Sequence, residues 1–136
     1  MTDTIMTVSG RTESGYGICI DSADSWIVAV NNAGPDSDPN NITFLGAHPN
    51  TDETFVLVDG KACIAVAPPG EPEGFTVSAM EKGVCYNVRR DTWHTVMMAA
   101  GGTVAICENR NPEGNRHDLS DEAKARLVKE AMAIFG

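Results

Sequence analysis

The sequence predicts an all-β fold, a sandwich or a barrel, that ends in one α-helix. Short runs of β-branched and aromatic residues recur about every eight to twelve residues, and Gly and Pro separate them. The last part of the chain instead has helical periodicity. The expected strands cover nine runs: 18–20, 26–30, 42–45, 54–58, 62–66, 75–80, 84–88, 94–98 and 103–107.

The residues between the runs are typical of turns and loops. Asp59-Gly60 separates two apolar runs and predicts a β-hairpin with the glycine at positive φ. Gly101-Gly102 separates two more. The proline-rich segment 67–72 cannot be a central strand and predicts a loop. The polar stretches 31–41 and 108–118 predict further loops.

The C-terminal segment predicts an amphipathic helix. Ser120 can cap its N-terminus, and the two acidic residues that follow suit the positive end of the helix dipole. We expect this helix to lie against the outside of the sheets or across a dimer partner. The apolar face is expected to consist of Leu127, Val128, Ala131, Met132 and Phe135.

Composition excludes several classes of partner. The formal net charge is −9, so nucleic acid and anionic membrane surfaces are poor candidates. The sequence has no basic leader and no apolar stretch of spanning length, which favours a cytoplasmic protein without a membrane span. The four cysteines are widely spaced and are interpreted as buried free thiols in strands.

Two segments carry a histidine–carboxylate pattern at defined spacing. His48, Glu53 and Gly60 lie in the first segment, and Gly83 and His94 lie in the second. Both segments resemble the two sequence motifs of the cupin family. The resemblance covers about residues 42–107 and implies a double-stranded β-barrel, or jelly roll. The length of 136 residues predicts a single domain over 1–136. We expect its barrel core at about 15–110 and the helix at about 120–135.

The motifs are incomplete in this chain. The first family motif begins with two histidines, and the first of these is Gly46 here. In the second motif the family's proline and glycine are Arg89 and Asp91, and its last asparagine is Met98. A four-ligand metal site of the family would therefore lack one ligand.

Strand geometry explains why His48, Glu53 and His94, called the trio below, should meet. Alternate residues of a strand share a face, so Glu53 is expected to point inward with Phe55, and His94 with Val96. Together with His48 they would form a polar cluster in an apolar barrel mouth, where unpaired polar groups are costly. Two histidines and one carboxylate suit a divalent first-row metal: Mn, Fe, Co, Ni or Zn. A metal-free pocket for a small acid or amide, and a relic site, are the alternatives.

A narrower resemblance concerns the segment 83–94. Its Gly83, Tyr86 and Trp93-His94 are similar to the ureidoglycolate lyase group of the cupins, and His48-Pro49 resembles the start of that group's first motif. The resemblance implies elimination of urea from ureidoglycolate, a small hydroxy acid.

Under that resemblance the metal and catalytic residues are His48, Glu53 and His94, with Tyr86 as a further catalytic residue. The polar residues near the strand ends that could help are Tyr86, Arg89, Arg90 and Glu108, and an arginine could clamp the substrate carboxylate. His117 is expected at the surface.

Three functions follow from these observations. The first is a metal-assisted lyase acting on a small polar carboxylate or carbohydrate-derived substrate, and as a cupin it would be a homodimer. The second is a non-catalytic cupin that binds or senses a small polar ligand. The third is a structural homodimer with a decayed site. Gly46 favours the second and third functions, whereas the retained trio favours the first.

Overall fold

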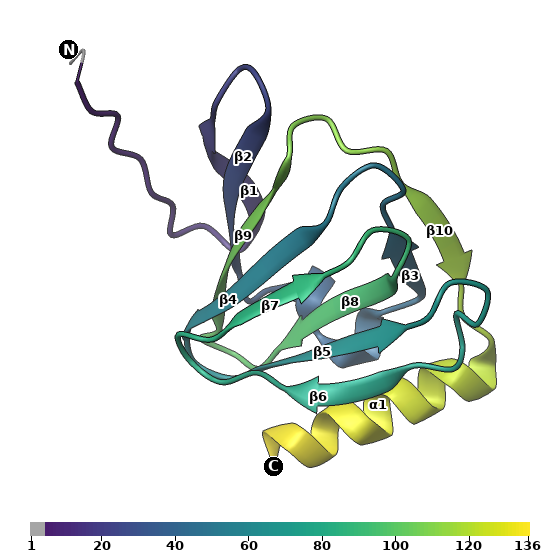
Figure 1. The fold of residues 1–136 in the computed structure, drawn as a ribbon. Helices are drawn as coiled ribbons and strands as arrows, with labels where there is room; N and C mark the ends of the chain where they lie inside the picture. The colour runs from purple at the N-terminus through teal and green to yellow at the C-terminus, as the bar shows by residue number, and fades with distance from the viewer. Residues whose placement is uncertain (1–4) are drawn as a thin grey trace.

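The computed structural model describes residues 5–136, which form two five-stranded antiparallel sheets and one long helix (Figure 1). The first sheet has the order β1-β2-β9-β4-β7. Its strands are β1 (Gly15–Asp21), β2 (Trp26–Asn32), β9 (Thr103–Asn109), β4 (Glu53–Asp59) and β7 (Cys85–Val88). The second sheet has the order β10-β3-β8-β5-β6. Its strands are β10 (Asn115–Asp118), β3 (Phe44–Ala47), β8 (Trp93–Met98), β5 (Ala62–Ala67) and β6 (Thr76–Ala79).

The inner faces of the two sheets form one hydrophobic core. In β4, Glu53, Phe55 and Leu57 are buried, and the residues between them are more exposed. This alternation confirms the expected face of the strand. The buried residues of this inner core are Ala29, Phe55, Leu57, Ala62, Ile64, Met80, Val88, Met98, Val104 and Ile106. The architecture confirms the predicted all-β jelly roll with a C-terminal helix.

The helix α1 (Asp121–Phe135) covers the outer face of the second sheet, next to β5 and β6 (Figure 1). The Ser120 hydroxyl accepts a hydrogen bond from the Ala123 N–H at 3.1 Å, as expected of a cap. Leu127 and Ala131 are fully buried against a second core that includes Leu45 and Met97. Met132, expected on the apolar face, is 47% exposed.

The turn at Gly60 differs from the expected hairpin. Its φ is +74°, as predicted, but β4 and β5 belong to different sheets and do not pair. The turn therefore carries the chain from one sheet to the other. The turn after β8 does the same, and the two turns pack together: a Cβ on Gly60 would lie 2.7 Å from Gly102 Cα. A glycine at positive φ signals a tight turn but does not say which strands pair.

Two predicted loops contain more structure than expected. The stretch 31–41 contains two 3-10 helices, Pro35–Ser37 and Pro39–Asn41, after the end of β2. The stretch 108–118 contains β10, which pairs with β3 along its whole length. β10 is an edge strand of polar residues, so it has no apolar alternation by which it could be recognised.

Candidate metal centre

Three strand ends bring the predicted trio together. Glu53 opens β4 in the first sheet, and His94 is the second residue of β8 in the second sheet. His48 directly follows β3, whose Gly46 pairs with His94. The Asp91 N–H also donates to the His48 carbonyl at 2.9 Å, which ties the two motif segments to each other. The cluster therefore bridges the two sheets at one end of the inner core.

The functional atoms of the trio converge on one point. His94 Nε2 lies 2.9 Å from Glu53 Oε1, and His48 Nε2 lies 3.2 Å from the same oxygen. One ligand atom from each of the three residues lies within 4.8 Å of the others. Glu53 and His94 are buried, whereas the His48 side chain is 23% exposed. Solvent therefore reaches the cluster from the His48 side.

Backbone carbonyls orient both imidazole rings. His94 Nδ1 lies 2.9 Å from the Thr92 carbonyl oxygen, and His48 Nδ1 lies 2.7 Å from that of Glu113. A carbonyl can only accept, so each Nδ1 carries the proton and donates it. In a neutral ring this leaves a lone pair on Nε2. Metal-binding histidines have this arrangement, with the outer nitrogen held by a second partner.

The three converging acceptor atoms require a positive charge between them. Two neutral Nε2 lone pairs and an ionised carboxylate oxygen are all acceptors, and they cannot lie 2.9 and 3.2 Å apart without a proton or a cation between them. Metal–ligand bonds of about 2.1 Å place neighbouring ligands about 3.0 to 3.4 Å apart. The observed separation of 3.2 Å lies within that range, and the separation of 2.9 Å lies just below it. The residues therefore fit a divalent first-row metal.

The neighbouring carboxylates also shift the pKa of His94. Burial on its own lowers the pKa of this imidazole. The hydrogen bonds to Glu53 and to the Thr92 carbonyl, with the charges of Glu53 and Glu108, outweigh burial and raise the pKa above its ordinary value. Without a metal, His94 can supply the positive charge as imidazolium.

Glu108 is a fourth acidic or basic residue at the cluster. It lies on β9 directly opposite Glu53, it is 7% exposed, and its Oε1 is 3.8 Å from His48 Nε2. Within residues 5–136, that buried oxygen has no hydrogen-bond partner. Burial, followed by the charge of Glu53, raises the pKa of Glu108 to about 7. The sequence indicated Glu108 only as a polar residue near a strand end.

The two tyrosines differ in their relation to the cluster. The hydroxyl of Tyr86, the predicted catalytic tyrosine, accepts a hydrogen bond from the Glu81 N–H at 2.8 Å. Tyr16 on β1 has its pKa raised to about 12 by burial and then by the negative charges of Glu108 and Glu53. No sequence motif marks Tyr16, so sequence reasoning could not select it. The catalytic role of Tyr86 stays a prediction.

His117 pairs with Glu73 instead of with the trio. His117 Nε2 lies 3.0 Å from Glu73 Oε2, and the His117 side chain is 31% exposed. Glu73 also accepts from the Ser120 N–H at 2.8 Å, so this pair ties β10 to the start of α1. The Arg90 N–H donates to Asp52 at 2.9 Å in the turn before β8.

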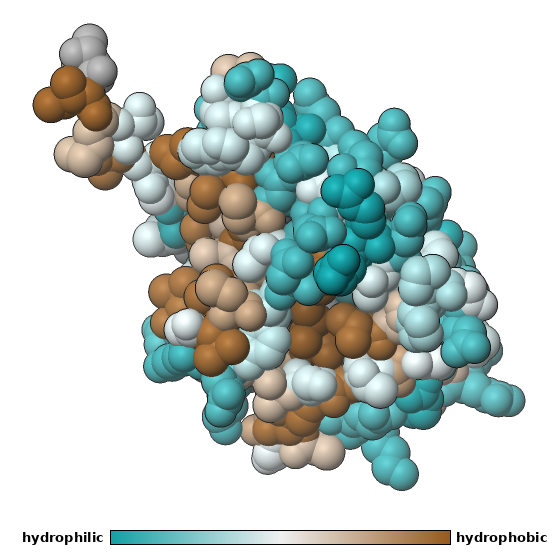
Figure 2. Space-filling model, in the orientation of Figure 1, coloured by the Kyte–Doolittle hydropathy of each residue, from teal (hydrophilic) through white to brown (hydrophobic). Residues whose placement is uncertain are grey.

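A slot opens beside the cluster, between the edge strand β7 and strand β5. It has a volume of about 320 Å³, within the range of small-molecule sites. Val88, the partner of Glu53, and Val66, the partner of His94, are both in its wall. Figure 2 shows apolar surface between these strands. The lining consists of Ile64, Val66, Ser78, Tyr86, Asn87, Val88, Arg89 and Thr92.

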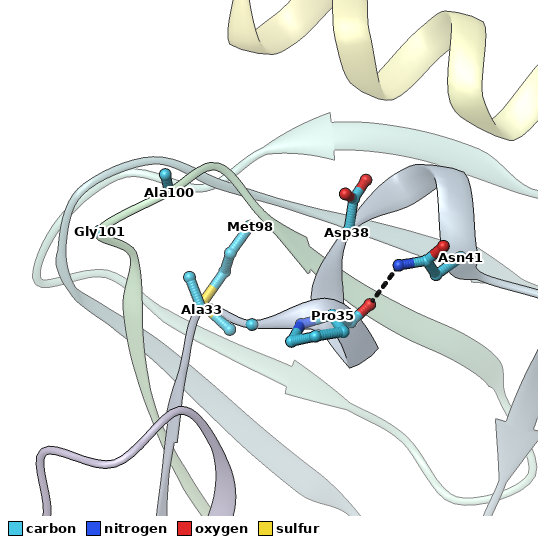
Figure 3. Close-up of a pocket in the computed structure, with 8 residues that line it drawn as sticks. Ala33, Pro35, Asp38, Asn41, Met98, Ala100 and Gly101 are labelled. Carbon is cyan, nitrogen blue, oxygen red and sulfur yellow. Dashed lines mark hydrogen bonds between the residues drawn. The ribbon is translucent and has the colours of Figure 1, made fainter.

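Two other hollows lie elsewhere on the surface of the protein. One of about 280 Å³ lies at the barrel rim and is lined in part by Glu108, Thr51 and Arg90. A larger one of about 410 Å³ lies between the 3-10 helices and the turn after β8 (Figure 3). Neither this hollow nor the slot is lined by a member of the trio. Unlike the slot, this hollow also has no residue that pairs with one, and its Met98 lies at the opposite end of β8 from His94. Its size therefore does not connect it with the metal chemistry.

Comparison with known proteins finds similarity at the level of structure. No protein-family model matches the chain, and no curated protein sequence matches it. Hydroxypropylphosphonic acid epoxidase (HppE) from S. wedmorenis superposes with a TM-score of 0.54 at 17% identity, over 70% of this chain and 49% of that one. A Co(II) form of HppE in complex with substrate gives 0.56 at 17% identity, over 79% and 58%. The chain thus spans only about half the length of the HppE chains.

A smaller protein matches over most of its length. A cupin-2 domain containing protein from Shewanella frigidimarina superposes with a TM-score of 0.52 at 14% identity, over 74% of this chain and 85% of that one. At such identities the likeness concerns the fold, and function must be argued from the site. The chain has the two-sheet jelly-roll fold of the cupins.

Proposed function

We propose that this chain is a divalent-metal-dependent enzyme that acts on a small hydroxy acid, with His48, Glu53 and His94 as metal ligands. The observation that carries the proposal is the convergence of two Nε2 lone pairs on one carboxylate oxygen, with both Nδ1 atoms held by carbonyls. Such a set leaves several metal positions open for substrate. The Fe(II) and Co(II) structures of HppE support a metal in this fold.

The neighbouring slot supports a small substrate. A bound metal would act as a Lewis acid on the substrate hydroxyl and carboxylate. Val66 and Val88 give the slot apolar walls, and Arg89 in the lining is the proposed partner of a carboxylate. The Tyr86 hydroxyl accepts from a backbone N–H, so its own proton is free to donate into the slot.

Elimination of urea from ureidoglycolate is the specific reaction that we propose. It moves the hydroxyl proton from oxygen to the departing nitrogen while the carbon–nitrogen bond breaks and a carbonyl forms. Tyr86 is the proposed group that passes this proton. The support for this substrate is the similarity of segment 83–94 to the ureidoglycolate lyase group.

A non-catalytic binding protein is the second candidate. Gly46 is the observation that favours it, because the position that pairs with His94 provides no side chain to the cluster. A sensor needs only to hold a small polar carboxylate or carbohydrate-derived ligand in the slot. Both candidate functions predict that a ligand binds in the slot, but only the enzyme predicts turnover.

We also propose a homodimer located in the cytoplasm. Support for the dimer is the apolar surface on the N-terminal segment and on β1 and β2, where Ile5, Val8 and Ile18 are all more than half exposed (Figure 2). All four cysteines are free, which agrees with a reducing compartment. Within residues 5–136, no helix has the length and apolar character needed to cross a membrane. Light scattering coupled to gel filtration tests the dimer.

A turnover assay separates the candidates. Protein loaded with Mn²⁺, Fe²⁺ or Co²⁺ is incubated with ureidoglycolate and with a panel of other small hydroxy acids, and product is followed by mass spectrometry. The proposal expects turnover that chelation abolishes, that metal restores, and that Tyr86→Phe reduces more strongly in kcat than in KM. Saturable binding of a panel member without turnover would support the sensor instead.

A further inference from the structure

We infer that Glu108 is a fourth protein ligand of the metal, so that the centre consists of two histidines and two carboxylates and prefers a hard divalent ion such as Mn²⁺ or Fe²⁺. The inference rests on the proposed metal centre and goes beyond it. A separate observation carries it: the isolated carboxylate oxygen on β9.

Glu108 Oε1 is an acceptor without a donor. The residue is 7% exposed, and this oxygen is fully buried with no hydrogen-bond partner in residues 5–136. Buried polar atoms in native proteins nearly always have a partner, and an exception needs an explanation. His48 Nε2 is 3.8 Å from this oxygen and is itself an acceptor in the neutral ring. A cation between the two atoms satisfies both.

The sheet holds the two carboxylates in opposition. Glu53 and Glu108 are direct partners across the β4–β9 pair, and β9 is also paired with β2 on its other side. The backbone therefore cannot carry Glu108 away from the cluster. Like charges directly opposite each other destabilise a sheet. One divalent ion would neutralise both carboxylates where both sheets meet.

Gly46 explains why a ligand from the first sheet is needed. This glycine pairs with His94, so a side chain at position 46 would share the inner face with His94. A Cβ placed there would meet only the Asn115 carbonyl, at 3.8 Å. The second sheet thus leaves one flank of the cluster empty, and Glu108 enters from the first sheet. Replacing an imidazole by a carboxylate shifts preference toward harder ions.

Metal titration tests the inference with matched variants. Wild type, Glu108→Gln, Glu53→Gln and the exposed helix variant Glu122→Gln are titrated with Mn²⁺ by calorimetry after chelation. We expect Glu108→Gln to lose more than about 100-fold in affinity, beyond the 10- to 100-fold typical of losing an outer partner. Glu122→Gln should bind as wild type does. Thermal melts of the metal-free variants check that each is folded.

Each outcome identifies what fails. A loss below 100-fold in Glu108→Gln, beside a large loss in Glu53→Gln, would overturn the inference and leave the proposed centre standing. Absence of Mn²⁺ binding by wild type would overturn both. A crystal soaked in Mn²⁺ gives a second readout that does not depend on a variant. The inference expects a Glu108 oxygen at about 2.0–2.3 Å from the anomalous peak, and an oxygen beyond 3 Å contradicts it.

Discussion

Between about pH 5 and 8, the stability of the metal-free protein should fall as the pH rises, and Glu108 should cause much of the fall. Burial, with the charge of Glu53, raises the pKa of Glu108 from 4.5 to about 7. Between these values the folded chain binds more protons at this site than the unfolded chain does. The stabilisation is therefore complete below about pH 4.5 and is lost as the pH rises through about 7.

The magnitude follows from the size of the shift. One pKa unit corresponds to about 1.36 kcal/mol, so the shift of Glu108 is on the order of 3 kcal/mol of unfolding free energy. His94 also has a raised pKa and contributes in the same direction. The difference between wild type and Glu108→Gln isolates the share of Glu108, because the amide does not titrate.

Urea denaturation in the presence of a chelator measures this share. Wild type and Glu108→Gln are unfolded at pH 5, 6, 7 and 8, and the difference in unfolding free energy is plotted against pH. We expect wild type to lose on the order of 3 kcal/mol relative to the variant across that range. A difference that stays flat, or that favours wild type at high pH, would refute the buried, proton-binding Glu108.

Three further substitutions test the local geometry. Gly46→His should raise Mn²⁺ affinity on the order of tenfold and lower any turnover, because it adds a ligand in open space and occupies a metal position; unchanged affinity in calorimetry argues against that placement. Gly60→Ala should destabilise by more than about 2 kcal/mol in urea titration, through strain at φ +74° and contact with Gly102; a neutral result would mean the turn adjusts. Asp91→Gly should stabilise by about 1 kcal/mol, because Asp91 has a φ of 67°; destabilisation would show that its side chain is needed.

The sequence predicted the strands well because most of them bury one face. Regular apolar runs between Gly and Pro identified nine of the strands, and the capping pattern at Ser120 identified the helix. β10 was missed because an edge strand of polar residues has no such pattern. The hairpin at Asp59-Gly60 was wrong, since a positive φ fixes the local bend and leaves open which sheet the next strand joins.

The candidate site could be predicted only in part. Motif spacing predicted that His48, Glu53 and His94 meet, and the structure brings their ligand atoms within 4.8 Å of one another. Their role as metal ligands stays a prediction. Glu108 had no spacing signal, because its proximity comes from the β4–β9 register, which joins segments far apart in the chain. Asp91 shows the reverse case: the motif's glycine is absent, but the left-handed backbone that the glycine would favour is kept.

Metal content is the most direct test of the central claim that His48, Glu53 and His94 hold a divalent ion. Untagged protein is purified without chelator and analysed by inductively coupled plasma mass spectrometry, together with His48→Ala, His94→Ala and the control His117→Ala. The account predicts about one first-row divalent metal per chain in wild type and in His117→Ala, and little in the other two. Full metal content in His94→Ala, or none in wild type even after loading with Mn²⁺, Fe²⁺, Co²⁺ or Zn²⁺, would contradict it.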